Sequence, residues 1–196
     1  MNNESRQINA TQPASSMYYI AIVLPPSINE QVLQWKQWFR NQFGCTVGLK
    51  SPAHITLVPP HWMHIAAEAA LAAAVAQFAQ NQSTFVLSTQ GFSAFKPRTI
   101  FAAVQHSDAL HQLKQNLETA LTANPALNIK KENRPFHPHI TLATRDLRPQ
   151  HFAQAWPHFA TKEFQVEWEV ASISILKHNG RHWHVWYDVP FGTNRE

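Results

Sequence analysis

Apolar residues recur along the chain at spacings that predict short strands and amphipathic helices. An uninterrupted apolar run over 18–24 predicts a buried strand, which Pro25-Pro26 would end. The next apolar residues recur every three or four positions and predict a helix over 28–43. Ser27 and Glu30 have the spacing of a capping box for its start, and Gly44 offers a C-terminal stop.

The rest of the chain repeats this rhythm of strands and helices. The remaining predicted elements are, in chain order, extended pieces at 46–49 and 54–58, the second ended by Pro59-Pro60, an Ala-rich helix over 62–80, strands at 84–92 and 99–104 around a turn at 96–98, a helix over 107–122, a strand at 139–143, and a short helix from Pro149 that ends before Pro157. Alternating runs over 164–170 and 183–189 flank Asn179-Gly180, which predicts that the two runs form a closing hairpin. Strands that alternate with helices but also form hairpins indicate an α+β fold with mixed or mainly antiparallel sheets.

Composition predicts one folded domain and excludes several classes of protein. The chain has 196 residues, of which 44% are hydrophobic and 14% charged, so it can bury a core and is not a highly charged disordered chain. Its single cysteine, Cys45, excludes an internal disulfide framework and a zinc site built from thiolates. We expect the polar residues 1–16 to be a disordered tail and residues 17–196 to form the domain.

Charge and hydropathy bear on partners and location. The formal net charge of +4 and the 12 histidines favour an anionic substrate over a cationic one. Basic residues are scattered, with no run longer than Lys130-Lys131, so a DNA-binding face is not expected. No segment has the apolar core of a signal peptide or the roughly 18 apolar residues of a membrane span, so we expect a soluble, cytoplasmic protein without a membrane partner.

The tetrapeptide His-Ile-Thr-Leu occurs twice, at 54–57 and at 139–142. Both copies lie in predicted strands, where side chains alternate between faces. His54 therefore shares a face with Thr56, and His139 shares the corresponding face with Thr141. If the two halves of the chain are pseudo-symmetric lobes, the two imidazoles and the two hydroxyl groups meet around one small volume that suits a phosphate.

Two imidazoles on opposite sides of a phosphorus atom can run an in-line displacement without a metal. An imidazole has an ordinary pKa of about 6.5, so it can act as a general base when neutral and as a general acid when protonated. The threonine hydroxyl groups would donate hydrogen bonds to the non-bridging oxygens as charge moves onto them. Neither motif contains a carboxylate, which argues against a two-metal mechanism, and we expect no metal or other cofactor.

The sequence resembles the 2H phosphoesterase superfamily, specifically its bacterial RNA 2′,3′-cyclic phosphodiesterase and 2′-5′ RNA ligase family. The resemblance lies in the paired motifs, in the segment Arg-Pro-Phe-His-Pro-His-Ile-Thr-Leu-Ala-Thr-Arg over 134–145 and in the opening strand over 18–25, and it covers about residues 17–190. It implies a bilobal, pseudo-two-fold arrangement of two mainly antiparallel sheets, with helices on the outside and a central groove that holds both motifs. The segment 58–62 departs from the family's apolar run ending in glycine, at a place that bears on which nucleoside or leaving group is accepted.

The resemblance also implies an activity and roles for the motif residues. His54 would be the acid and His139 the base, with Thr56 and Thr141 as phosphate ligands. The enzyme would hydrolyse, or in reverse ligate, 2′,3′-cyclic phosphate ends of RNA or small cyclic nucleotides, as a monomer and without a metal. Two alternatives stay open: a related activity on ADP-ribose cyclic phosphate or 2′-5′ oligoadenylate, and a module that binds phosphate or RNA ends with little turnover.

Several residues around the motifs are candidates for substrate binding. Arg134, Arg145, Lys96 and Arg98 could bind or steer phosphate, and the alternative for each is a solvated turn. Phe136 could stack on a base, and the alternative is packing in the core.

A few other aromatic and histidine residues have weaker claims. Trp62, close to the first motif, has the same two interpretations as Phe136. His61 and His64, three apart at a predicted helix start, and His182 and His184, on one strand face, could each ligate a metal, although surface or packing histidines are the simpler interpretation.

Overall fold

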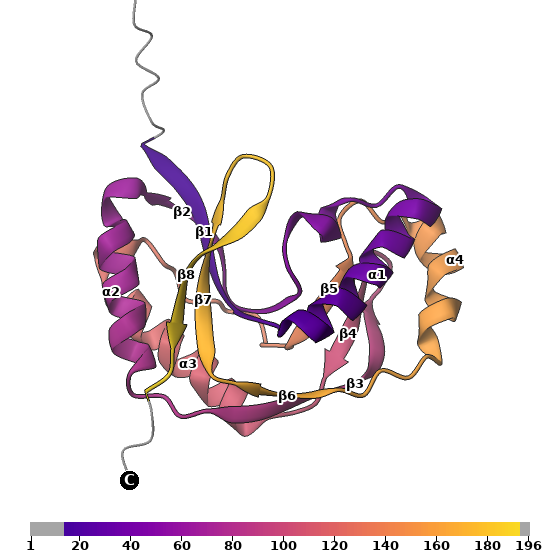
Figure 1. The fold of residues 1–196 in the computed structure, drawn as a ribbon. Coiled ribbons are helices and arrows are strands. Elements are labelled where there is room, and N and C mark those ends of the chain that lie inside the picture. The colour runs from indigo at the N-terminus through magenta and orange to yellow at the C-terminus, as the bar shows by residue number, and fades with distance from the viewer. Residues whose placement is uncertain (1–13, 193–196) are drawn as a thin grey trace, which may run out of the picture.

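The computed structural model describes residues 14–192, which contain eight strands and four α-helices (Figure 1). The strands are β1 (Ser15–Val23), β2 (His54–His64), β3 (Phe85–Phe95), β4 (Thr99–Val104), β5 (His139–Ala143), β6 (Glu167–Val170), β7 (Ser172–His178) and β8 (Trp183–Pro190). The helices are α1 (Pro26–Phe43), α2 (Glu68–Ala79), α3 (Asp108–Thr122) and α4 (Pro149–Ala160), with short 3₁₀ turns at Val47–Lys50, Ile65–Ala67 and Pro125–Leu127. No helix in this part of the chain is long and apolar enough to cross a membrane.

The strands form two antiparallel sheets with matching strand orders. One sheet has the order β2-β1-β7-β8 and the other β5-β4-β3-β6. Each sheet has one His-Ile-Thr-Leu strand at its edge: β2 in the first sheet and β5 in the second. Strand β2 pairs with β1 in the unit β1-α1-β2-α2, and β5 pairs with β4 in the equivalent unit β4-α3-β5-α4. The predicted α+β, bilobal and pseudo-two-fold arrangement is therefore confirmed.

The two halves exchange helices and so share one core. Helix α1 packs against β5 in the other sheet, and α3 packs against β2, while α2 covers β7 and β8, and α4 covers β3 and β4. The buried apolar residues of both halves form one large continuous cluster. Figure 1 shows the helices on the outside of the two sheets, with β3 and β6 along the bottom of the view. Relative movement of the lobes is therefore resisted by packing, which favours a rigid frame around the seam.

The first helix begins two residues earlier than the predicted capping box allows. Pro25 is the N-cap and Pro26 the first helical residue, with no side chain capping the helix, so the predicted box at Ser27 and Glu30 does not form. A proline suits this position because its missing N–H would have no intrahelical partner there. The predicted stop at Gly44 is confirmed, with φ of 70° in the left-handed region that glycine adopts without strain.

Strand β2 continues through Pro59-Pro60 to His64, although these prolines were predicted to end it. It is an edge strand, so the missing N–H groups need not break a ladder on both sides. The register against β1 shifts opposite the prolines, between Tyr18 and Ile20, which accommodates them as an irregularity. The Ala-rich helix predicted to start at 62 consequently begins only at Glu68.

The predicted extended piece at 46–49 is also wrong, because this segment forms a 3₁₀ turn at Val47–Lys50. The Asp146 carboxylate accepts hydrogen bonds from the backbone N–H groups of Thr46 (2.6 Å) and Val47 (2.9 Å). It thereby satisfies donors that a helical turn leaves unpaired at its start. Gly48 is required there, because a Cβ atom would collide with the carbonyl oxygen of Leu142 in β5.

The C-terminal hairpin forms with the predicted Asn179-Gly180 turn but with a different first strand. Strand β7, not the run over 164–170, pairs with β8, while β6 pairs with β3 in the other sheet. Residues Ile173 to Leu176 of β7 are all buried, so they show no alternation of buried and exposed positions that would predict a strand.

Helix α4 also runs beyond the predicted limit at Pro157, to Ala160. Its last turn is held by packing, because the fully buried Phe159 ring stacks on Phe39 at 5.2 Å. At the other end of the chain, β1 begins at Ser15, inside the predicted tail over 1–16. Residues 1–13 lie outside the described residues.

Candidate active site

The two His-Ile-Thr-Leu strands meet at the seam between the sheets. Strands β2 and β5 are edge strands of different sheets and contact each other. The apolar residues of both motifs are buried as predicted: Ile55, Leu57, Ile140 and Leu142 are each at most 1% exposed. The histidines and threonines of both motifs are half-buried on the opposite strand faces.

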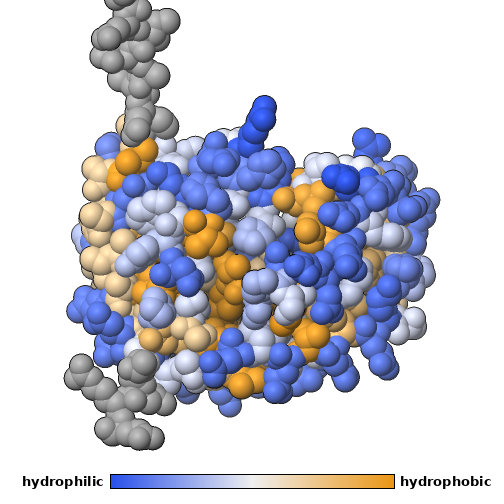
Figure 2. All heavy atoms as spheres, in the orientation of Figure 1, coloured by the Kyte–Doolittle hydropathy of each residue, from blue (hydrophilic) through white to orange (hydrophobic). Residues whose placement is uncertain are grey.

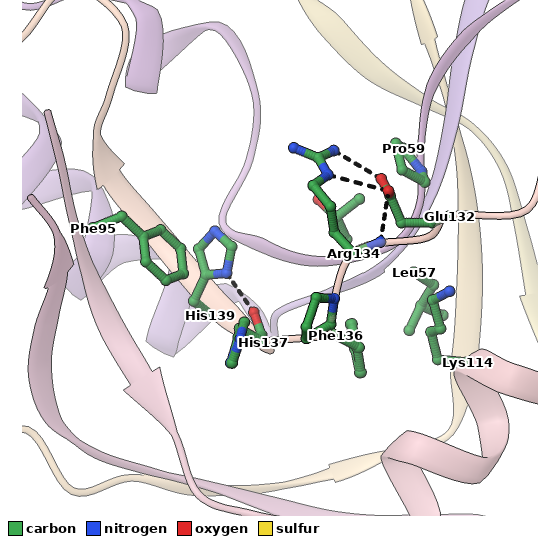
Figure 3. Close-up of a pocket in the computed structure, with 11 residues that line it drawn as sticks. Leu57, Pro59, Phe95, Lys114, Glu132, Arg134, Phe136, His137 and His139 are labelled. Carbon is green, nitrogen blue, oxygen red and sulfur yellow. Dashed lines mark hydrogen bonds and ion pairs between the residues drawn. The ribbon is translucent and has the colours of Figure 1, made fainter.

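All four motif residues line two adjoining hollows. The His54 hollow, of about 390 Å³, is lined by His54, Thr56 and Thr141 among others. The His139 hollow, of about 470 Å³, is lined by His139 and again by Thr56 (Figure 3). Thr56 borders both hollows, and the two hollows together are here called the groove. Figure 2 shows apolar side chains in the middle of the face drawn in Figure 1, bordered by hydrophilic ones.

The backbone fixes both imidazoles in the same way. His54 Nδ1 lies 2.8 Å from the carbonyl oxygen of Pro52, and His139 Nδ1 lies 2.6 Å from that of His137. A carbonyl oxygen only accepts hydrogen bonds, so in each ring Nδ1 must carry the hydrogen and donate it. In the neutral ring, Nε2 is then the unprotonated nitrogen, which can accept a proton from a reacting group.

The loop before His54 is itself anchored. Asn29 in α1 accepts a hydrogen bond from the backbone N–H of Ala53 through its Oδ1 atom (2.7 Å). Tyr19 of β1 lies against the imidazole of His54, with ring centres 4.9 Å apart, and its own ring meets Trp183 edge to face at 4.6 Å. Burial raises the pKa of Tyr19, so its hydroxyl group stays protonated at neutral pH. These contacts hold the first imidazole against strand β1.

Burial and neighbouring charges lower the proton affinity of both histidines. The pKa of His54 is lowered to about 4, first by burial and then by the positive charges of Lys36 and His139, against the carbonyl of Pro52, which raises it. The pKa of His139 is lowered, mainly by burial and to a smaller extent by the side chain of His137. The hydrogen bond to the backbone carbonyl of His137 acts in the opposite direction. Both rings therefore favour the neutral form at pH 7, and a bound phosphate anion would raise both pKa values.

Lys36 brings a buried positive charge close to the first motif. Its side chain is only 4% exposed, and Nζ donates a hydrogen bond to the carbonyl oxygen of Ser51 at 3.0 Å. Burial lowers its pKa to about 8, so the amine is still mainly protonated at pH 7. It forms no salt bridge with the carboxylates of residues 14–192, which leaves its charge available to attract an anion.

A chain of charged groups shapes the far side of the His139 hollow (Figure 3). Lys114 pairs with Glu118 at 2.8 Å, and Glu118 accepts a hydrogen bond from the backbone N–H of Glu132 at 2.7 Å. The Glu132 carboxylate in turn accepts from Arg134 Nε (3.1 Å) and Nη2 (2.7 Å), and these bonds lower its pKa to about 2. The guanidinium of Arg134 is thereby held at the mouth of the groove.

The structure brings most of the other predicted binding residues to the groove. Arg134 and Phe136 line the His139 hollow, and Arg145 lines the His54 hollow. Lys96 and Arg98 do not line either hollow but are exposed in the turn between β3 and β4, with the neighbouring Phe95 lining the His139 hollow instead. Their predicted role in phosphate binding thus has no support from the geometry.

Sequence reasoning missed three residues beside the motifs: Phe95, Tyr19 and Lys36. The ring of Phe95 meets that of His139 edge to face at 5.1 Å. The sequence could have indicated Tyr19, because it lies on the opening strand β1, which pairs with the motif strand β2. The position of Lys36 carries no signal, because its neighbours come from tertiary packing.

The predicted metal-ligating pairs are not grouped with further ligands. Within residues 14–192, no three His, Cys, Asp or Glu side chains lie close enough together to hold a metal ion. His61 and His64 lie on strand β2 rather than at a helix start, with His61 Nδ1 3.2 Å from the carbonyl oxygen of Pro59 and His64 accepting from the N–H of Ala66. His182 lies in the hairpin turn, just before β8, which holds His184.

Comparison with known proteins agrees with this architecture. The family model of the 2′-5′ RNA ligase superfamily matches residues 24–182, a span that includes both histidine motifs. The chain belongs to the 2′-5′ RNA ligase superfamily. This membership confirms the resemblance to the 2H phosphoesterase superfamily and its 2′-5′ RNA ligase family.

Solved structures of this superfamily's fold cover nearly the whole chain. Escherichia coli LigT complexed with 3′-AMP is 20% identical, with 91% of this chain and 99% of that chain covered and a TM-score of 0.65. TT0787 of Thermus thermophilus is 19% identical, with 91% and 100% covered and a TM-score of 0.63. At such identities the likeness concerns the fold. No curated protein matches the chain in sequence.

Proposed function

We propose that this protein is a metal-independent phosphodiesterase that opens 2′,3′-cyclic phosphates at RNA ends or on nucleotides, with water as the attacking group in hydrolysis and an RNA hydroxyl group in its place in ligation. The observation that carries the proposal is the pair of imidazoles, each held through Nδ1 by the carbonyl two residues before it. The four motif side chains line one groove, with the buried cation of Lys36 near His54. This arrangement suits an anion that must exchange two protons.

The proposed hydrolysis is an in-line displacement at phosphorus. One neutral imidazole takes a proton from water through Nε2, the water oxygen bonds to phosphorus, and the bond from phosphorus to one ribose oxygen breaks. The second imidazole, protonated in the complex, gives its Nε2 proton to the departing oxygen, which yields a phosphomonoester and a free hydroxyl group. The hydroxyl groups of Thr56 and Thr141 donate to the non-bridging oxygens.

The two imidazoles have different environments, which bears on their roles. The family resemblance assigns the acid role to His54 and the base role to His139. However, burial and the charge of Lys36 lower the pKa of His54 to about 4, which favours its neutral form. This effect suits the base of hydrolysis, so the pH profiles of single-histidine variants decide the assignment.

Two solved complexes of LigT agree with the proposed chemistry. LigT has been solved with 3′-AMP and with phosphate. A nucleoside 3′-monophosphate is one of the two products that opening a 2′,3′-cyclic phosphate can yield. LigT has also been solved with NADP⁺, which carries a 2′-phosphate, and this favours including other 2′-phosphorylated nucleotides among the candidate substrates.

The test is turnover of nucleoside 2′,3′-cyclic phosphates in the presence of EDTA. Cyclic mononucleotides, ADP-ribose cyclic phosphate and 2′-5′ oligoadenylate form the panel, and the variant that lacks both His54 and His139 is the control for contaminating activity. We expect release of a phosphomonoester by the wild-type protein only. Turnover that EDTA abolishes and a divalent metal restores would refute the metal-free mechanism, and binding without turnover would indicate the binding-module alternative.

A further inference from the structure

The groove continues beyond the His139 hollow along strand β2. A third hollow, of about 410 Å³, is lined by Trp62, Lys130 and Lys131, and it shares Pro59 and Glu132 with the His139 hollow. Thr56 and Trp62 are six residues apart on β2, which corresponds to about 20 Å along a strand. These two hollows are therefore neighbours along β2, and the row of hollows from Thr56 to Trp62, here called the channel, is longer than one nucleoside.

Trp62 presents an exposed indole at the end of this channel. Its side chain is 61% exposed, more than any other large apolar residue in the described part of the chain. Its backbone is nevertheless ordered by pairing with Met17 of β1 and by a hydrogen bond that its carbonyl oxygen accepts from Asn128 Nδ2 at 3.4 Å. A fixed strand that carries a free aromatic face can stack on a base at low entropic cost.

The charges around Trp62 complement a nucleic-acid backbone. Lys130 and Lys131 are both exposed and form no salt bridge with residues 14–192. The one acidic residue that lines this hollow, Glu132, is paired with Arg134 through two side-chain hydrogen bonds. Two unpaired cations beside an exposed aromatic ring are the combination with which proteins bind single strands.

We infer that Trp62, Lys130 and Lys131, here called the Trp62 platform, bind the single-stranded RNA that leads up to a terminal cyclic phosphate. The inference rests on the proposed function, and it makes RNA ends several nucleotides long better substrates than cyclic mononucleotides. One base stacks on the indole of Trp62, while Lys130 and Lys131 neutralise backbone phosphates.

The platform is tested by equilibrium binding, which does not depend on turnover. The probe is a fluorescein-labelled hexaribonucleotide that ends in a 3′-phosphate, titrated by fluorescence anisotropy at several salt concentrations. We expect Trp62→Ala to weaken binding about tenfold and Trp62→Phe to retain most of the affinity, because a phenyl ring still stacks. The double variant Lys130→Gln/Lys131→Gln should reduce the slope of log K against log salt by about 1.4, as expected for two lost phosphate contacts.

Two matched controls lie elsewhere on the surface. Tyr187, 42% exposed on β8 at the opposite edge of the sheet from β2, is replaced by alanine, and the exposed Arg40 in the last turn of α1 is replaced by glutamine. Both controls should keep the affinity and salt slope of the wild-type protein. If Trp62→Ala and the double lysine variant bind the hexanucleotide like the controls, the platform does not exist.

A second readout separates the platform from the proposed function. The ratio of kcat/KM for a cyclic-phosphate hexanucleotide to that for a cyclic mononucleotide should exceed one in the wild-type protein and fall about tenfold in Trp62→Ala. A ratio of one in the wild-type protein would overturn the platform. If no substrate is turned over at all, the proposed function fails, while the binding experiment still decides whether the platform binds RNA.

Discussion

The two motif threonines offer the most direct test of transition-state stabilisation in the groove. Thr56 and Thr141 are half-buried in the groove wall, and neither hydroxyl group has a hydrogen-bond partner among residues 14–192. The hydroxyl groups are therefore not needed to hold the strands. Valine has the same branched shape, so Thr56→Val and Thr141→Val should each change the free energy of unfolding by less than about 0.5 kcal/mol.

The catalytic effect of each substitution should be much larger than its effect on stability. Loss of one donor to a developing oxyanion costs about 2.7 to 4 kcal/mol, which is about 10² to 10³ in kcat. KM should change less, because the bond strengthens as charge moves onto the non-bridging oxygens. Single-turnover kinetics on a cyclic mononucleotide measures the chemical step, and thermal unfolding measures stability.

A threonine outside the groove serves as the control for the general effect of replacing threonine by valine. Thr119 lies on the exposed face of α3, where its hydroxyl donates to the carbonyl oxygen of Gln115 at 2.9 Å. Thr119→Val should turn over substrate at the wild-type rate. Wild-type kcat in both Thr56→Val and Thr141→Val would show that these hydroxyl groups do not face the phosphate, and the proposed geometry would be wrong.

The substitutions His54→Ala and His139→Ala should each lower kcat by about 10² to 10⁴ in a steady-state assay, and EDTA should not change the rates. Lys36→Met removes a cation that disfavours protonated His54, so the pKa of His54 should rise and the limb of the pH–rate profile that it controls should move to higher pH; an unmoved limb would contradict the coupling. The pKa of His54 is about 6.5 in the unfolded chain and about 4 in the folded protein, so folding favours the neutral ring. The free energy of unfolding, measured with urea, should therefore fall as the pH falls from 6.5 toward 4, and this fall should be smaller in His54→Gln. Gly48→Ala should lower the free energy of unfolding by about 1 to 3 kcal/mol, since its Cβ would collide with the Leu142 carbonyl, and an unchanged midpoint would show that the turn can shift freely.

The duplicated motif predicted the grouping of the four candidate side chains because its information is local. Alternation on a strand fixes which side chains share a face, so His54 could be grouped with Thr56 and His139 with Thr141 from the sequence alone. The meeting of the two pairs required the pseudo-symmetry, which the repeat indicated. Edge positions for both strands then followed from the fold and could not be read from either motif.

The errors in the prediction come from contacts between distant parts of the chain. The turn after Thr46 depends on Asp146, a hundred residues later, and strand β6 takes its partner from β3 rather than from the neighbouring hairpin. Strand β2 tolerates Pro59-Pro60 because it lies at an edge. Local propensity describes what a segment prefers in isolation, and these segments are decided by what lies across from them.

A repeated motif supplies two equal imidazoles, whereas acid–base catalysis needs two that differ. The structure keeps the common part equal, because the carbonyl oxygens of Pro52 and His137 bind Nδ1 of the two rings in the same way. The difference arises outside the motifs. Lys36 lies on α1, which packs against β5 of the other half, and it adds a positive charge to the surroundings of His54. At His139 the corresponding neighbour is His137, which lowers the pKa of His139 less than burial does. In the proposed mechanism, the local repeat positions the two proton carriers, and the charge of Lys36 makes the surroundings of His54 differ from those of His139.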